Sequence, residues 1–318
     1  MESMFEGCED LTSVNLANFD FSEVESMKAM FKGDIRLERV IFGNDMDTRY
    51  LRNMEEMFYM CNSIQSLDLT KLNTKNVITM DNLFRDCINL SDLKIDNFNT
   101  ENVISMSYMF YNCSSLKDLN ITHFDFSKTN TISKMFYNCN ILQNIQISFS
   151  SAESITEIDN LFNGCSSLTS LDLSSFDTSR VTDMSYMFYN CSSLTSIDLS
   201  HLNLSKIISM DNMFYGSNLL KYIYNIALKI DRCIAIYLHV ISYNETAIKF
   251  YKKNKYKNVA KIDNYYNFED KNYDAFVFMR IISKIEKEEF KIKSGIAIKE
   301  NKFYFNHIYK YIIKIIIL

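Results

Sequence analysis

The stretch FDTSRVTDMSYMFYNCSSLTSIDLSH, residues 176–201, contains the pattern that decides the fold of most of the chain. Its Phe188 belongs to a series of phenylalanines that recur every 26 residues, with one interval of 27: Phe5, Phe31, Phe58, Phe84, Phe110, Phe136, Phe162, Phe188 and Phe214. A period of roughly 20 to 50 residues is typical of proteins built from stacked structural repeats. The sequence therefore predicts copies of one unit over residues 1–216, because each short unit needs its neighbours to bury its apolar side.

Each unit carries, after this Phe, a short apolar pattern that is typical of a strand. Aliphatic residues stand six, nine and eleven positions later, as Leu168, Leu171 and Leu173 do in one unit. This LxxLxL spacing is the leucine-rich-repeat strand signature, and its alternation places both side chains of LxL on one face. Other units carry the same positions: Leu116, Leu119 and Ile121, and Leu194, Ile197 and Leu199.

The residues before the Phe have the spacing of a short helix. Val181, Met184, Met187 and Phe188 fall at i, i+3, i+6 and i+7, which is one helical face. The candidate capping residues are Asp177, Thr178 and Ser179. The predicted fold class of residues 1–216 is therefore α/β, a right-handed parallel leucine-rich-repeat solenoid of 26-residue strand-plus-short-helix units with a core of Phe, Met and Leu columns.

The quoted stretch, with MFYNCSSLTSIDLSHLNLSKIISMDNMF at residues 187–214, resembles the BspA-like leucine-rich repeats of mycoplasma-type lipoproteins. Met-Phe, Cys, LxxLxL and Phe-Asp recur in register over residues 1–216. The resemblance implies a surface adhesin or interaction module that binds a protein or glycan partner. It also implies that the repeats carry no catalytic residue.

A cysteine column stands three positions after the recurring Phe. It comprises Cys8, Cys61, Cys87, Cys113, Cys139, Cys165 and Cys191, with Asp34 and Ser217 as exceptions. Stacked repeats place equivalent atoms about 5 Å apart, so a disulfide chain or a metal ladder is one interpretation. Each unit offers one Cys and no partnered His, which favours buried, reduced thiols and no metal.

Two further columns are candidate recognition positions. A tyrosine column could form a recognition stripe or, as the more favoured interpretation, cap helix ends and pack between coils: Tyr59, Tyr111, Tyr137, Tyr189 and Tyr215. The outward strand position between the two core residues of LxL varies and is polar: Asn15, Asp68, Lys94, Asn120, Gln146, Asp172 and Asp198. From Asp68 to Asp198 this strand column is the predicted partner-binding face, although a solvated sheet face would have the same composition.

Composition excludes several function classes. The 318 residues include no Pro, no Trp and six Gly. No two glycines are close enough for GxGxxG or GxxxxGK[ST], so these nucleotide loops are absent from the sequence. Residues 1–220 hold 15 Lys/Arg against 29 Asp/Glu, whereas residues 221–318 hold 19 against 10. This charge contrast predicts a domain boundary near 220 and argues against nucleic acid as the partner of the acidic part.

A second pattern begins after the repeats. We predict helices over 219–229 and 244–253 and strands over 234–240, 256–262 and 273–282, the last two joined by a polar turn over 267–272. The stretch IYLHVISYNETAIKFYKKNKYKNVAKIDNYYNFEDKNYDAFVFMRII, residues 236–282, resembles the C-terminal half of a GNAT acetyltransferase of the NatE-like protein N-alpha-acetyltransferase type. The predicted partial domain spans residues 217–283, followed by a Lys/Ile-rich tail over 284–318.

This second resemblance implies roles for five residues. It implies that His239 is a general base, and a His of unperturbed pKa about 6.5 suits deprotonation of an α-amino group. It implies that Asn244 and Tyr251 line the coenzyme A arm, and that Tyr265 and Tyr266, between the last strands, contact the N-terminus of the substrate. A Lys cluster from Lys249 to Lys257 could attract the 3′-phosphate of the coenzyme or be a solvated face.

The chain departs from the GNAT pattern where the coenzyme binds. The family holds the pyrophosphate on a [QR]xxGxG/A loop, but SMDNMFYGSNLL at residues 209–220 is a repeat with one Gly, in which Gly216-Ser217 could be a remnant of that loop. Enzyme activity therefore stays uncertain, and no cofactor is expected unless the acetyltransferase interpretation, with acetyl-CoA, holds. A fusion of two genes within MFYGSNLL is a third interpretation.

The two ends bear on localisation. MESMFEGCED shows no signal peptide, and the apolar stretch 311–318 is far shorter than the ~20 residues of a spanning helix. As given, the chain is expected to be cytoplasmic with no membrane span. It starts in mid-repeat, which suggests a truncated gene model; a lost signal peptide would place the protein at the cell surface or outside the cell.

Overall fold

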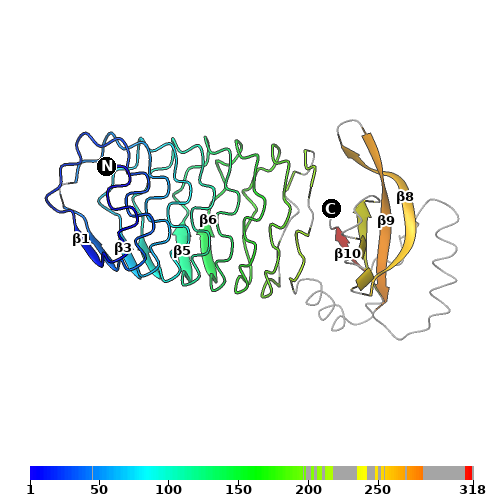
Figure 1. The fold of residues 1–318 in the computed structure, drawn as a ribbon. Helices are drawn as coiled ribbons and strands as arrows, with labels where there is room; N and C mark the ends of the chain where they lie inside the picture. The colour runs from blue at the N-terminus through cyan, green and yellow to red at the C-terminus, as the bar shows by residue number, and fades with distance from the viewer. Residues whose placement is uncertain are drawn as a thin grey trace. The chain divides into compact units, whose positions relative to one another are not determined.

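The structure, a computed structural model, describes residues 1–195 except 45, and 197, 202–203, 206–209, 212–217, 235–241, 248–249, 252–253, 255–268, 271–281 and 312–316. The chain divides into two compact units, Met1–Asn218 and Leu219–Leu318. The first is a stack of coils that follow one another along the chain (Figure 1). We call it the repeat unit.

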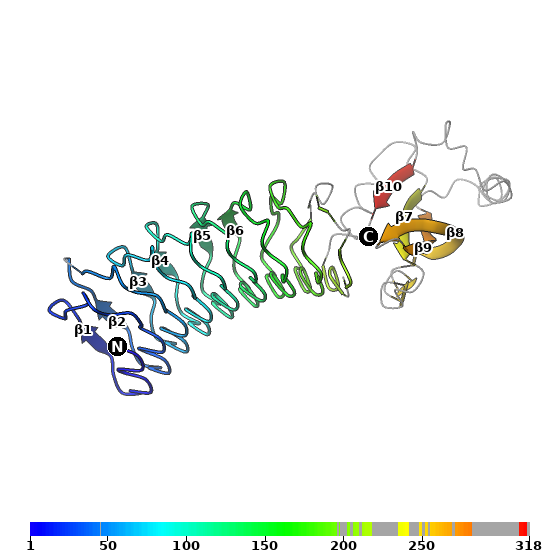
Figure 2. The same cartoon turned by 90° about the horizontal axis from the view of Figure 1, so that it is seen from above.

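Short parallel strands lie along one side of the repeat unit (Figure 2). They are β1 (Ser13–Asn15), β2 (Arg39–Ile41), β3 (Ser66–Asp68), β4 (Asp92–Lys94), β5 (Asp118–Ile121) and β6 (Asn144–Ile147). They pair as β1 with β2, β3 with β4 and β5 with β6, with partners such as Leu119 and Ile145 one repeat apart. In β5 the burial alternates from exposed to buried, as the LxL pattern predicts.

The predicted strand does not form in every described unit. Residues 169–173 have no strand assignment, although Leu168, Leu171 and Leu173 are all buried. The apolar pattern therefore predicts the burial of these side chains correctly, but the β-strand that it also predicts is absent from this unit. The strand predicted over Leu194–Leu199 lies partly outside the described residues.

The predicted helix of each repeat is wrong. Val181, Met184, Met187 and Phe188 are buried as expected, but residues 179–190 form turns and a bridge instead of a helix. Alternate backbone N–H groups donate to the next coil, as Phe188 does to the Met213 carbonyl (2.9 Å). The N–H groups between them close four-residue β-turns, as the Met187 N–H does with the Met184 carbonyl (3.3 Å). The i→i−4 bonds of an α-helix therefore do not form.

The same backbone pattern runs through every coil, and we call it the turn ladder. One parallel bridge links each coil to the next, from Ser26 and Asn53 to Asp183 and Ser209. Each coil also has two residues of positive φ four positions apart, such as Tyr186 (58°) and Asn190 (56°). Left-handed backbone costs non-glycine residues about 1 kcal/mol, and Asn adopts it most readily. The coil-to-coil hydrogen bonds hold this conformation.

The predicted capping residues link coils. Thr178 is fully buried, and its Oγ1 donates to the Asn203 carbonyl in the next coil (2.8 Å). Thr74 and Thr100 repeat this contact with the carbonyls of Asn99 and Asp125. Asp177 accepts the N–H of Ser179 (2.8 Å) in a local turn. These residues therefore stabilise turns and stacking where helix caps were expected.

The core is a set of stacked columns. All nine recurring Phe rings are stacked on their neighbours, with ring-centroid distances from 5.3 Å to 6.0 Å. Met and Leu side chains line the same interior, and Met106, Met109, Leu116 and Leu142 are at most 1% exposed. Each coil thus buries its apolar residues against the coils before and after it, as the period predicts.

The second unit contains a four-stranded sheet in the order β10-β7-β9-β8. Its strands are β7 (Ala235–Ile241), β8 (Lys257–Phe268), β9 (Lys271–Ile281) and β10 (Ile312–Ile316). β9 is antiparallel to both β7 and β8, and β10 is parallel to β7. Residues 248–249 and 252–253 are helical, inside the predicted helix over 244–253, while the helix predicted over 219–229 lies outside the described residues.

The structure corrects one expectation for this unit and adds a strand to the tail, for which no secondary structure was predicted. The polar turn predicted over 267–272 is tighter, because Asn267 pairs with Asn272 and Phe268 with Lys271 inside the β8–β9 hairpin. Part of the Lys/Ile-rich tail is a strand, since β10 pairs with β7. Within the described residues, no helix is long and apolar enough to cross a membrane.

Candidate binding surface

The exposed side of the turn ladder carries aromatic and basic side chains in two columns. These columns stand two residues before and one residue after the recurring Phe. From the third to the sixth coil these columns hold eight residues, among them Glu56 and Asn82. We call the six aromatic and basic ones the ridge: Tyr59, Arg85, Tyr108, Tyr111, Lys134 and Tyr137. All six are only partly buried, so their polar ends reach the surface.

Arg85 lies at the centre of the ridge. Its guanidinium carbon is 5.2 Å, 5.1 Å and 4.8 Å from the ring centroids of Tyr59, Tyr108 and Tyr111, three rings from two coils besides its own. Nη1 donates to Asn82 Oδ1 (3.2 Å), and Nε forms an ion pair with Asp86 at 3.4 Å. Three cation–π contacts and the ion pair therefore fix the position of the guanidinium among the rings.

Lys134 forms the second cationic point of the ridge. Its Nζ lies 3.1 Å from Tyr108 Oη, 3.2 Å from Asp159 Oδ2 and 5.1 Å from the Tyr108 ring centroid. Burial lowers the pKa of Lys134, but the hydrogen bond with Tyr108 and the charge of Asp159 outweigh it and raise the pKa above its ordinary value. Lys134 is therefore charged at neutral pH.

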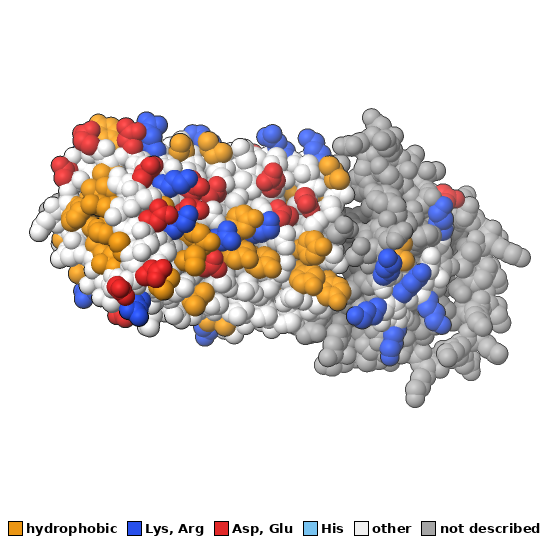
Figure 3. All heavy atoms as spheres, in the orientation of Figure 1, with side chains coloured by type: hydrophobic (Ala, Val, Ile, Leu, Met, Phe, Trp, Pro, Cys, Tyr) orange, Lys and Arg blue, Asp and Glu red, His pale blue; other side chains and the backbone are white. Residues whose placement is uncertain are grey.

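Tyrosine rings stack between coils, as one interpretation of the tyrosine column predicted. Tyr111 and Tyr137 stack at 4.7 Å, and Tyr189 and Tyr215 stack at 5.1 Å. Burial, followed by the neighbouring Tyr137, raises the pKa of Tyr111. The capping role predicted for this column is wrong because the described repeats contain no helix to cap. On the face seen in Figure 3, hydrophobic and basic side chains lie next to one another along the repeat unit.

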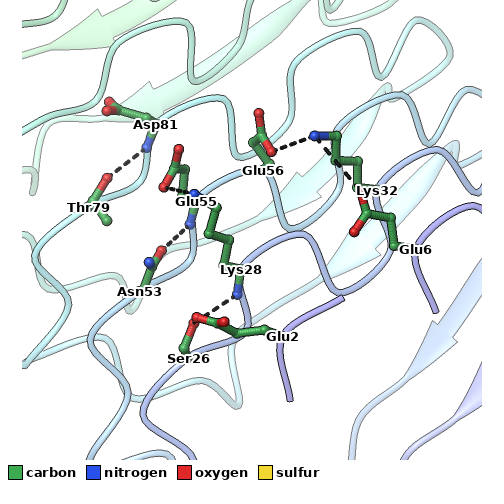
Figure 4. A network of polar contacts seen from close by, with 10 residues as sticks. All are labelled: Glu2, Glu6, Ser26, Lys28, Lys32, Asn53, Glu55, Glu56, Thr79 and Asp81. Atoms are coloured by element: carbon green, nitrogen blue, oxygen red, sulfur yellow. Dashed lines mark hydrogen bonds and ion pairs between the residues drawn. The ribbon is translucent and has the colours of Figure 1, made fainter. Parts of the chain in front are cut away.

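The first coils carry a different surface, a network of ion pairs between neighbouring coils (Figure 4). Lys28 contacts Glu55 and Lys32 contacts Glu56, each at 2.7 Å, and Lys32 also lies 3.9 Å from Glu6. The hydrogen bonds with these glutamates raise the pKa of both lysines. Partly exposed pairs of this kind each stabilise by about 0–1 kcal/mol. Their acidic and basic groups neutralise one another.

The strand column of predicted partner-binding residues is exposed, but several of its members have local partners. Asp68 accepts the N–H (3.0 Å) and hydroxyl (2.6 Å) of Thr70, and Asn120 does the same with Thr122. Asp172 accepts the N–H of Ser174 (2.8 Å), and Lys94 lies 3.8 Å from Asp68. Gln146 is exposed in β6, and Asp198 lies outside the described residues. These contacts form the turn after the strand, so the column has a structural role of its own.

The cysteine column is a ladder of buried thiols. Cys61, Cys87, Cys113, Cys139, Cys165 and Cys191 are free and buried, and each Sγ donates to the carbonyl of the recurring Phe in the preceding coil at 3.0–3.1 Å. Burial raises the pKa of all six, to about 12 for Cys139 and Cys191. Cys8, at the first coil, is exposed.

We expect these thiols to be unreactive in the folded protein, because the thiolate is the reactive form and burial disfavours it. Brief treatment of the native chain with iodoacetamide at pH 8, followed by peptide mass mapping, should modify Cys8 and leave the six buried cysteines unmodified. Denaturant should make the six buried cysteines react as well. Equal labelling of Cys113 and Cys8 without denaturant would contradict the buried ladder.

Asp34 occupies the cysteine position of the second coil. It is fully buried, its Oδ1 accepts the N–H of Cys8 (2.8 Å), and its Oδ2 has no hydrogen-bond partner. Burial, together with the nearby charge of Glu6, raises the pKa of Asp34 to about 6. A thiol here could donate to the preceding Phe carbonyl, but an ionised carboxylate cannot. Asp34 in its ionised form therefore lowers the stability of the core at this position.

The acetyltransferase-like residues are only partly described. His239 lies in β7, where its backbone pairs with Val277 of β9 and Ile316 of β10. Tyr265 and Tyr266 lie within β8, which continues beyond the strand predicted to end at residue 262, and Tyr266 pairs with Tyr273 of β9. Asn244 and Tyr251 lie outside the described residues. In the part of the chain that the structure describes, no three His, Cys, Asp or Glu residues are placed to hold a metal.

Gly216 is explained by the repeat. Its φ is 77°, and it stands at the second positive-φ position of its coil, like Gly7, Gly33 and Gly164. A Cβ there would collide with the side-chain oxygen of Asn190 and lie 3.3 Å from its Cα. The turn ladder therefore accounts for this glycine without a remnant of a coenzyme loop.

Coils of one length around stacked Phe, Cys and Leu columns define a repeat protein with a solenoid-like fold. The chain belongs to the family described as "Mycoplasma protein of unknown function, DUF285", whose model matches residues 1–119, 52–150 and 113–226. The match agrees with the resemblance of residues 1–216 to BspA-like repeats and covers nothing beyond residue 226. No curated protein matches the chain.

The prediction from sequence found the tyrosine column but missed the ridge. Arg85 shares that column and was overlooked because it interrupts the tyrosines. Tyr108 and Lys134 belong to the column two positions before the Phe, which varies too much to be recognised as a pattern. Aligning the repeats and searching the partly buried columns for Tyr and Arg together would have found them.

Proposed function

We propose that the repeat unit is a binding module for a protein or glycan partner, and that its repeats carry no chemistry. The observation that supports this function is the contrast between core and surface. The Phe and Cys columns repeat the same contacts from coil to coil. The strand column and the column two positions before the Phe instead change residue type from one described coil to the next. Variable side chains on a regular frame suit recognition.

The proposal is tested with the full-length purified chain, immobilised and offered two probes, a phage-displayed library of random dodecapeptides and an array of immobilised glycans. We expect saturable binding of peptides or glycans that disappears when the chain is unfolded. The matched control is the same protein heated and cooled until its circular dichroism signal is lost. Binding of neither probe would refute the proposal.

We propose acetyl transfer from acetyl-CoA to an α-amino group as a second candidate function, for the second unit. It is supported by the order of elements: strands at 235–241, 257–268 and 271–281 and helical residues between the first two, as the GNAT resemblance implies. The resemblance places His239 as general base on the first of these strands. The repeat turn at Gly216, in place of a glycine-rich loop, argues against it.

Calorimetric titration of the full chain with acetyl-CoA separates the two candidates. Micromolar binding, followed by acetylation of a peptide N-terminus that His239→Ala abolishes without weakening the binding, would support the enzyme. Absence of acetyl-CoA binding would remove it and leave the binding module unaffected.

A further inference from the structure

Neighbouring side chains contact the faces of the ridge rings. Tyr111 and Tyr137 stack at 4.7 Å with an interplanar angle of 6°, and Arg85 lies over Tyr59, Tyr108 and Tyr111. A sugar ring packs its C–H groups against the open, electron-rich face of an aromatic ring. With those faces occupied, the ridge suits a protein partner better than a glycan.

Charge identifies the side chain that the partner must supply. The repeat unit is acidic, with 29 Asp/Glu against 15 Lys/Arg in residues 1–220. The two ridge columns, from the third to the sixth coil, nevertheless hold two cations, Arg85 and Lys134, against one acid, Glu56, which is paired with Lys32. Within the described residues, the Arg85 guanidinium makes one hydrogen bond, from Nη1 to Asn82 Oδ1, and one ion pair, from Nε to Asp86 Oδ2 at 3.4 Å. A planar guanidinium with N–H groups to spare matches a carboxylate in a two-point contact.

The ridge is also held ready for binding. The ring centroids of Tyr108 and Tyr111 are 5.6 Å apart. Lys134 Nζ contacts both Asp159 Oδ2 and Tyr108 Oη, so its position is fixed before a partner binds. Side chains that are already ordered lose little conformational entropy when a partner binds. Tyr and Arg are also the residue types that contribute most to binding at protein interfaces.

We propose that the ridge is the docking surface of the repeat unit for a protein segment that places an acidic side chain on Arg85, between Tyr59, Tyr108 and Tyr111. This inference rests on the proposed binding function and names the partner's chemistry and its point of contact. The ion-paired surface around Lys28 and Lys32 and the turn-forming strand column lie outside the docking surface.

The test uses the phage-displayed dodecapeptide library against the full-length chain. Selected peptides should share an Asp or Glu next to an apolar or aromatic residue. A synthetic selected peptide should bind Arg85→Gln at least about tenfold more weakly than the wild type, and Arg85→Lys should also bind it weakly because Lys lacks the two-point fork. Replacing the peptide carboxylate by its amide should cause a similar loss, with little further loss when combined with Arg85→Gln.

Controls keep the proposal falsifiable. Arg180→Gln, the same substitution at an exposed arginine outside both the ridge and the strand column, should leave binding unchanged, and circular dichroism melting checks that each variant is folded. If Arg85→Gln does not fold, Arg85→Lys and the amide peptide decide the question. Peptides without an acidic residue, or equal binding to wild type and the Arg85 variants, would overturn the ridge as the docking surface while the binding function stands. Binding of neither peptides nor glycans would overturn both.

Discussion

Phe110→Ala should destabilise the repeat unit by about 3–5 kcal/mol, the typical loss when a fully buried Phe is truncated. Phe110 is 0% exposed, and its ring stacks on Phe84 (5.5 Å) and Phe136 (5.6 Å). Its removal leaves a cavity at the centre of the ring column and interrupts contacts on both sides. In repeat proteins each coil is stabilised mainly by its nearest neighbours. The coils on the N-terminal side of Phe110 and those on its C-terminal side should therefore no longer unfold in a single transition.

The matched control lies in the same column. Phe5→Ala removes the terminal ring, which is partly exposed and stacks on Phe31 alone (5.4 Å), so it should cost less than half as much. Urea unfolding followed by circular dichroism gives both free energies, and hydrogen exchange shows which coils open first. If both variants lose the same free energy of unfolding, stacking between consecutive Phe rings adds nothing to stability beyond the burial of each ring.

Asp34→Asn should gain stability over the wild type as the pH rises. The pKa of Asp34 is raised in the folded chain to about 6, against an ordinary value of 3.8, because burial disfavours the charged carboxylate. A group with a raised folded pKa contributes its full stability below the unfolded value, and this contribution is lost as the pH rises through the folded value. Two pKa units correspond to about 2–3 kcal/mol.

The measurement compares the free energies of unfolding of wild type and Asp34→Asn at pH 4 and pH 8. The difference should grow by about 2–3 kcal/mol in favour of the variant, mostly between pH 4 and pH 6.5. The control is Asp96→Asn, a change of equal charge at an exposed position, which measures how much of the pH dependence comes from removing any one carboxylate. A pH-independent difference for Asp34→Asn would show that the carboxylate is not held in a poorly solvated site.

The pattern of burial could be predicted residue by residue in the repeat unit. Phe188, Cys191 and Leu194 recur at positions that differ little in type, and each is fully buried. The pattern of polar and apolar residues predicts which side chains are buried, and this prediction holds whether the backbone between them forms a helix, a strand or a turn. The exposure of Asp68 and Lys94 was equally predictable, but their value as recognition residues was not, because the turn that uses Asp68 is a contact of the backbone.

The pattern of polar and apolar residues could not show whether the backbone before each recurring Phe is a helix or a series of turns. An apolar spacing of three and four residues marks one face of an α-helix, and the turn ladder buries Val181, Met184 and Phe188 with the same spacing. What distinguishes the two is the acceptor of each N–H. In the ladder, alternate donors find a carbonyl in the next coil, about 25 residues away, and that partner exists only when the coils are stacked.

By itself, the sequence determined the period, the number of coils and the inward columns, because these depend on local polarity repeated at a constant interval. Only the tertiary structure decided that the repeats are turns instead of helices, and that Arg85 meets Tyr59 and Tyr111 across coil boundaries. Residues about 26 positions apart become neighbours through stacking, so the ridge is a property of the stack. The physical reason is the same in both cases: hydrogen bonds and cation–π contacts need a particular partner in space, whereas burial needs only the absence of water.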